Sequence, residues 1–129
     1  MIWSVLGILF GIIIGVVFNV PIPLAFTRYT AVVIIGLLDS IFGAIRAEVT
    51  NDKFNITIFI SGAFFNAILA IGITYLGEKL GLNLYLAATV VFTFRIFQNV
   101  GITRRVLLEN WMNKKKREEK VDKFVWRDE

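Results

Sequence analysis

The sequence predicts an all-α integral membrane protein, a bundle of four transmembrane helices with a basic cytoplasmic C-terminal helical tail. Hydrophobic residues make up 57% of the 129 residues and charged residues only 19%, against about 45–50% and 25% in soluble domains. Residues 1–27 and 54–77 carry no charged side chain. Each run is long enough to cross about 30 Å of hydrocarbon, which takes roughly 20 helical residues.

The first two predicted spans lie on either side of a proline-containing connection. We place the first at residues 2–18, and two prolines within residues 19–23 end it because proline lacks an amide donor. The second, residues 29–45, contains Asp39 and is 17 residues long. That is the lower limit for a span unless residues 24–27 also enter the membrane. A re-entrant loop is the alternative for this segment.

The last two spans are predicted at residues 56–76 and 80–103. A tight turn at residues 77–81 separates them, and Gly77 is our expected left-handed cap. Arg95 lies inside the fourth span, where a charge costs about 2.5–3.5 kcal/mol on the insertion scale. We therefore divide the chain into a transmembrane domain, 1–103, and a tail, 104–129.

The distribution of lysine and arginine predicts that both termini are cytoplasmic. With the N-terminus inside, eleven basic residues lie on the cytoplasmic side and only Arg28 and Lys79 lie outside. This excess follows the positive-inside rule. If the second segment is re-entrant instead, the C-terminal tail stays inside and the N-terminus moves outside.

Three glycines in the first helix follow a strict four-residue spacing: Gly7, Gly11 and Gly15. Such spacing reduces one helix face to backbone and lets a second helix approach closely. This face is therefore expected to be an interface, either with another helix of the same chain or between the copies of a homo-oligomer.

Polar residues within the spans are expected to form one intramembrane polar cluster. Its members are Asp39, Arg46, Asn66, Arg95, Gln98 and Asn99. Counting 1.5 Å per residue from the adjacent helix ends, Asp39 lies about 10 Å deep and Arg95 about 13 Å deep. Because either charge alone would be uncompensated, we expect an ion pair. It could fix helix register or serve transport or gating; alternatively, Arg95 could extend to the interface without a partner.

The tail is expected to continue the fourth helix as an amphipathic extension along the membrane surface. It carries nine basic and six acidic residues. Its basic residues are expected to contact anionic lipid headgroups. These contacts are predicted for Arg104, Arg105, Lys114, Lys115, Lys116 and Arg117.

The residue types present argue against an enzyme. Cys and His are both absent, which removes thiol nucleophiles, imidazole bases and the usual zinc, copper and haem ligands. Aspartyl proteolysis within a membrane needs two carboxylates, and only Asp39 lies inside a predicted span. We expect no cofactor, no metal and no nucleic-acid partner.

Several ordered motifs resemble those of the bacterial small basic protein family over roughly residues 3–108. They read LDSIFGAIRA at 38–47, FISGAFFN at 59–66, YLG at 75–77, LYLAA at 84–88, RIFQN at 95–99 and RR at 104–105. The resemblance implies a multi-span membrane protein without an assigned activity. Members are often encoded near cell-division and cell-wall genes, frequently beside single-span extracellular coiled-coil-like proteins, which suggests such a partner.

Two functions follow from these observations as expectations. The first is a membrane scaffold or complex subunit at the bacterial cell envelope that self-associates through the first helix. The second is a small oligomeric transporter or channel that uses the Asp39–Arg95 pair. A continuous aqueous route past the pair would favour transport, whereas a dry, paired cluster would favour the scaffold.

Overall fold

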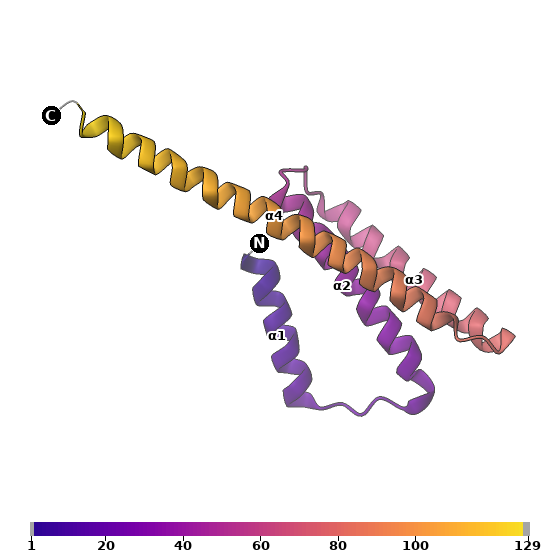
Figure 1. Ribbon diagram of the computed structural model, residues 1–129. Helices are drawn as coiled ribbons and strands as arrows, with labels where there is room; N and C mark the ends of the chain where they lie inside the picture. The colour runs from indigo at the N-terminus through magenta and orange to yellow at the C-terminus, as the bar shows by residue number, and fades with distance from the viewer. Residues whose placement is uncertain (1, 128–129) are drawn as a thin grey trace.

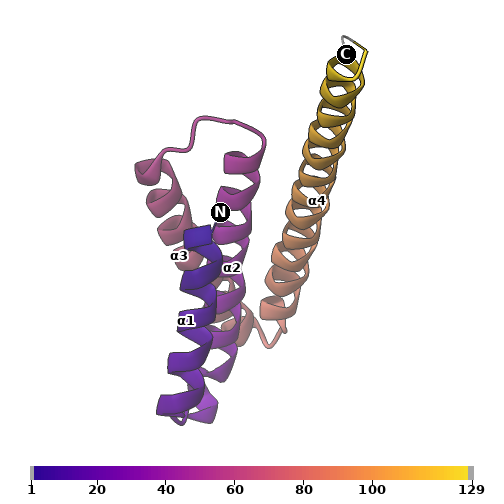
Figure 2. The same ribbon diagram turned by 90° about the vertical axis from the view of Figure 1, so that its left-hand side faces the viewer.

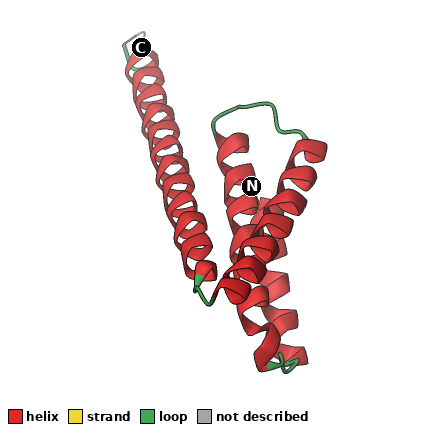
Figure 3. Ribbon diagram, turned by 90° about the vertical axis from the view of Figure 1, so that its right-hand side faces the viewer, coloured by secondary structure: helices red, strands yellow, loops and turns green. Residues whose placement is uncertain are grey.

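The computed structural model describes residues 2–127, which form an all-α structure (Figure 1). The elements are α1 (Ile2–Phe18), the 3₁₀ helix η1 (Leu24–Phe26), α2 (Thr27–Val49), α3 (Ile56–Leu80) and α4 (Leu84–Val125). Figure 3 shows that short loops connect these helices and that the described residues contain no strand. The all-α class predicted from the sequence is confirmed.

Helix α2 is the centre of a three-helix bundle. It packs along both α3 and α4, and α3 also contacts α4. The buried core is small and consists of Val32, Ala70, Ala88 and Phe92. Gly36 gives Phe92 its space, because an added Cβ at Gly36 would lie 3.4 Å from Cε2 of the Phe92 ring. Most large apolar side chains lie outside this core and are exposed. Such exposure is expected for helices surrounded by lipid rather than water.

Helix α1 stands apart from this bundle. Figures 1 and 2 show it joined to the other helices by the connection at 19–23 and running antiparallel to α2. Except for the half-buried Ile8, its large side chains are exposed, from 40% at Ile14 to 85% at Trp3. The extensive helix contacts of the described residues all lie among η1, α2, α3 and α4.

Both ends of α3 are capped, and one cap differs from our prediction. The Asn55 side chain accepts hydrogen bonds from the backbone N–H groups of Thr57 and Ile58, at 2.9 and 3.3 Å, which is typical N-capping. Gly81, with φ of 66°, is the left-handed residue at the other end. The prediction that Gly77 forms this cap is wrong. Gly77 lies inside α3, where an added Cβ would be only 2.6 Å from the carbonyl oxygen of Leu82.

Three helical stretches are long and apolar enough to cross a membrane: Leu24–Val49, Ile56–Leu80 and Leu84–Val125. The stretch Leu24–Val49 is longer than the second predicted span, residues 29–45, at both ends. Residues 24–27 extend it, and α2 is one continuous helix rather than a re-entrant loop. Helix α1, with 17 residues, lies at the lower limit for a span.

Helix α4 continues through the predicted boundary at residue 103 without a break. Its 42 residues correspond to about 63 Å at 1.5 Å per residue, and the ribbon is straight in Figures 1 and 2. We expected the part beyond Thr103 to lie along the membrane surface. A straight helix whose first half crosses the membrane would carry this part away from the surface, and the surface orientation stays a prediction.

Candidate polar site between three helices

The predicted polar cluster lies in one half of the bundle. We call the end of the bundle at residues 50–55 the loop end, and the opposite end at residues 81–83 the turn end. All six predicted residues lie between the apolar core and the loop end, on α2, α3 and α4. The predicted polar residues therefore lie nearer the loop end, whereas the core of Val32, Ala70, Ala88 and Phe92 lies nearer the turn end.

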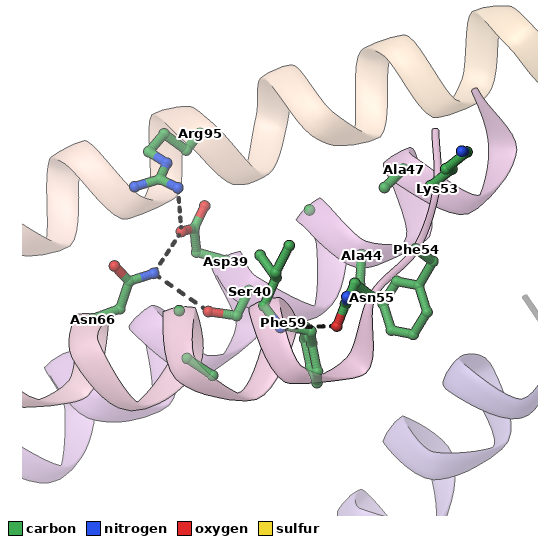
Figure 4. Close-up of a pocket in the computed structure, with 14 residues that line it drawn as sticks. Asp39, Ser40, Ala44, Ala47, Lys53, Phe54, Asn55, Phe59, Asn66 and Arg95 are labelled. Atoms are coloured by element: carbon green, nitrogen blue, oxygen red, sulfur yellow. Dashed lines mark hydrogen bonds and ion pairs between the residues drawn. The ribbon is translucent and has the colours of Figure 1, made fainter. Parts of the chain in front are cut away.

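Asp39 is the centre of the cluster and joins all three helices (Figure 4). Only 1% of the residue is exposed. Its Oδ2 atom lies 3.2 Å from Nη2 of Arg95 on α4 and accepts a long hydrogen bond, 3.5 Å, from Nδ2 of Asn66 on α3. The ion pair expected from the sequence is therefore present in the structure, and Asn66 supports it.

The Asp39–Arg95 pair is asymmetric in its burial. The Asp39 side chain is fully buried, whereas 52% of the Arg95 side chain is exposed. The second carboxylate oxygen, Oδ1, is also buried and has no hydrogen-bond partner among the described residues. A buried acceptor without a partner costs about 1–3 kcal/mol, so the site is not optimised for stability alone.

A second polar link joins α2 to α4 closer to the loop end, one turn along α4 and two turns along α2. Nη1 of Arg46 donates a hydrogen bond to Oδ1 of Asn99 at 3.3 Å, and Asn99 is buried. Gln98 is exposed and makes no hydrogen bond within the described part of the chain. The structure thus brings Asp39, Asn66 and Arg95 together and pairs Arg46 with Asn99, while Gln98 lies at the edge.

Ser40 belongs to this cluster although the sequence analysis did not include it. Its hydroxyl accepts a hydrogen bond from Nδ2 of Asn66 at 3.3 Å and donates to the backbone oxygen of Gly36 at 3.2 Å. The sequence feature that could have identified Ser40 is its position next to Asp39, a carboxylate inside a predicted span. Its role depends on how α3 is rotated against α2, which sequence spacing does not determine.

Two cavities flank α2 at the loop end. One, of about 270 Å³, lies between α2 and α3 and extends from Lys53 and Asn55 in the loop to Asp39 and Asn66. The other, of about 290 Å³, lies between α2 and α4. Arg95 lines both. Small residues on α2 open this space, chiefly Gly43 and Ala47, which also line both cavities.

The turn end carries a separate set of polar contacts that the sequence analysis missed. The Tyr29 hydroxyl donates a hydrogen bond to Oε2 of Glu78 at 2.7 Å, and the Arg28 guanidinium lies 5.2 Å from the centre of the Tyr85 ring. These contacts tie α2 to α3 and α4 at that end. They are typical of side chains at a membrane interface, where one end is apolar and the other is hydrated.

The remaining predicted residues are not part of this cluster. An added Cβ at Gly7, Gly11 or Gly15 on α1 would meet no atom within 4 Å. The basic residues expected to contact lipid are all exposed on α4. Across residues 2–127, no group of three acidic, Cys or His side chains could hold a metal ion.

The fold and the polar site define a class of protein: an all-α chain with three helices able to cross a membrane and, between two of them, an ion pair with a buried carboxylate. A family model described as protein of unknown function DUF1290 matches residues 22–108. The chain belongs to this family, and the resemblance to small basic proteins is confirmed by the relatives.

The chain is 41% identical to the "Small basic protein" of Bacillus subtilis over 117 residues, which cover 91% of this chain and 96% of that protein. Uncharacterized proteins of Mycobacterium bovis and Mycobacterium tuberculosis are each 34% identical over 99 residues, covering 75% of this chain and 81% of theirs. No solved structure matches the chain.

Proposed function

We propose that this protein is a four-span subunit of a bacterial membrane assembly, that it self-associates through α1, and that it acts as a scaffold in the cell envelope. Both termini and the loop end face the cytoplasm. A link to cell division or cell-wall assembly, and a single-span envelope protein as a partner, are further parts of this proposal. No catalytic step is included.

The observation that carries the proposal is the unpartnered state of α1 in a single chain. Its glycine face meets nothing within 4 Å, and its other faces expose large apolar side chains. In a membrane, close helix contacts through small residues come from dispersion and weak hydrogen bonds rather than from hydrophobicity. A second copy of α1 could supply those contacts on the glycine face.

The packing beside the ion pair also favours a scaffold over an open channel. Toward the turn end from Asp39, the buried residues Val32, Ala70, Ala88 and Phe92 form a packed apolar layer. The cavity that reaches Asp39 opens from the loop end. For the alternative function as a small transporter, this layer would have to open during each cycle.

The first experiment is native mass spectrometry of the detergent-solubilised protein, comparing wild type with Gly11→Leu. We expect a discrete oligomer in wild type and its dissociation in the variant, because the leucine side chain separates the two helix backbones. Gly72→Leu on α3 is a matched control, since an added Cβ there also meets nothing within 4 Å. It should leave the oligomer intact.

Cysteine cross-linking tests self-association independently. The chain contains no cysteine, so each introduced cysteine can form a disulfide only with a second copy. A single Gly11→Cys variant should form disulfide-linked dimers in membranes, whereas Gly72→Cys should not. Monomers in both assays would refute self-association through α1 and would direct the search to a different membrane protein as the partner.

A further inference from the structure

We infer that the cavity between α2 and α4 is a binding site for a phosphate group, such as the headgroup phosphate of an anionic lipid. The cavity of about 290 Å³ is lined by the side chains of Arg46, Arg95, Gln98 and Asn99, with Gly43 on α2 and Asp52 in the loop. Its volume is several times the roughly 30 Å³ that one water molecule occupies in the liquid. A phosphate with part of its hydration can therefore enter.

The lining supplies hydrogen-bond donors in excess of protein acceptors. Each guanidinium has five N–H donors in a planar fork. The contacts described above use one terminal nitrogen of each: Nη2 of Arg95 toward Asp39 and Nη1 of Arg46 toward Asn99. Arg46, Arg95 and Gln98 all line the cavity, so the other guanidinium nitrogens and the Gln98 amide are available as donors to a ligand.

These donors select the chemical class of the ligand. Two guanidinium groups can bind the oxygens of one phosphate through paired hydrogen bonds, and such charge-assisted bonds are stronger than neutral ones. The Asn99 side chain can also donate a hydrogen bond to a phosphate oxygen. Its Oδ1 accepts from Arg46, which leaves its Nδ2 as a donor on the side of Gly43, 3.7 Å from where a Cβ would stand.

The acidic residues near the cavity weaken the binding of an anion but do not prevent it. Asp39 lies behind Arg95 and lines the other cavity rather than this one. Asp52 lines this cavity from the loop, where its Oδ2 accepts a hydrogen bond from the Thr50 hydroxyl at 3.0 Å. Removing the Asp52 charge should therefore strengthen binding, which is a result specific to an anion site.

The position of the cavity brings it within reach of lipid headgroups. Arg46 lies at the loop end of α2, whereas Arg95 lies about 13 Å along α4 from Arg104. Basic pockets between helices on the cytoplasmic side of a membrane are typical binding sites for anionic headgroups. This part of the inference rests on the proposed membrane location but not on self-association through α1.

The test is a binding assay with fluorescent phosphatidylglycerol and the full-length protein in detergent, read by fluorescence anisotropy. We expect saturable binding to wild type, about tenfold weaker binding to Arg46→Gln and several-fold tighter binding to Asp52→Asn. Lys79→Gln at the turn end removes the same charge far from the cavity and should bind like wild type. Equal losses in Arg46→Gln and Lys79→Gln, or no loss in either, would overturn the inference.

Competition identifies the source of the phosphate. Displacement of the probe by inorganic phosphate would show that the anion alone is recognised, whereas displacement only by unlabelled phosphatidylglycerol would assign the site to a lipid headgroup. Phosphatidylcholine that competes as well as phosphatidylglycerol would contradict a site for an anionic ligand. If Arg46→Gln fails to fold, Gly43→Leu fills the cavity without changing any charge, and its unchanged binding would refute the site.

Discussion

At the scale of single residues, the ion pair joins a buried carboxylate, Asp39, to a half-exposed guanidinium, Arg95. The Asp39 side chain is buried, whereas half of the Arg95 side chain is exposed. Removing Arg95 therefore leaves an uncompensated buried carboxylate, while removing Asp39 leaves a guanidinium that can still extend toward the interface. The two single substitutions should not be equally harmful, and Arg95→Leu should be the worse of them.

A double-mutant cycle measures this coupling. Asp39→Asn and Arg95→Leu should each destabilise the protein, and the double variant should recover a coupling free energy of about 1–3 kcal/mol. The measurement is the folded fraction against denaturing detergent, followed by circular dichroism. Arg104→Leu on the exposed part of α4 is the control and should show no coupling with Asp39→Asn. Additive losses for Asp39 and Arg95 would contradict a functional pair.

At the scale of elements, α4 combines two roles in one straight helix. Its first half packs on α2, and its second half carries the basic residues of the tail. Lys114 lies nine residues beyond Arg105, about 14 Å along the axis and beyond the roughly 8 Å Debye length at physiological salt. Residues 114–117 therefore lie farther along α4 than Arg104 and Arg105, and their contact with lipid headgroups stays a prediction.

Distance measurements between spin labels test the continuity of α4. Labels at Val100→Cys and Val121→Cys should be about 32 Å apart in a straight helix, since 21 residues separate them. A pair at Leu86→Cys and Val100→Cys, within the packed half of the helix, is the control and should give about 21 Å. A short or broad distribution for the first pair alone would mean that the tail bends back toward the membrane.

At the scale of the whole molecule, the arrangement of α1 determines the topology and the assembly. With the tail in the cytoplasm, as we propose, a spanning α1 also places the N-terminus in the cytoplasm. An α1 that does not span leaves the N-terminus on the outside with the connection at 19–23. The positive-inside rule places the loop end and the tail in the cytoplasm in both arrangements, because these parts contain most of the lysine and arginine residues. Residues 1–27 contain neither lysine nor arginine, so the rule does not choose between the two arrangements. Self-association through α1 requires this helix to lie within the bilayer.

Single cysteine variants can determine the topology. With a membrane-impermeant maleimide on intact cells, Val20→Cys and Asn83→Cys should be labelled, whereas Asp52→Cys should react only after the cells are permeabilised. Ile2→Cys should behave like Asp52→Cys, because a spanning α1 places it inside. Labelling of Ile2→Cys in intact cells would reduce the number of spans to three.

The sequence by itself determined the helical class and the positions of the apolar helices, and it predicted the pairing of Asp39 with Arg95 that the structure contains. These follow from local properties: the length of charge-free runs, the spacing of residues along a helix and the cost of an isolated charge in an apolar medium. The end of α1 at Phe18 agrees with the prediction, since the prolines that follow it cannot continue the helix.

Only the tertiary structure decided which helices pack together and what lies between them. The inclusion of Ser40, the role of Gly77 in a close approach to Leu82 and the cavities beside Arg95 depend on how α2, α3 and α4 are rotated against one another. That rotation follows from contacts between residues far apart in the chain, such as Phe92 against Gly36. Residue spacing describes one helix at a time, so it cannot supply the angle between two.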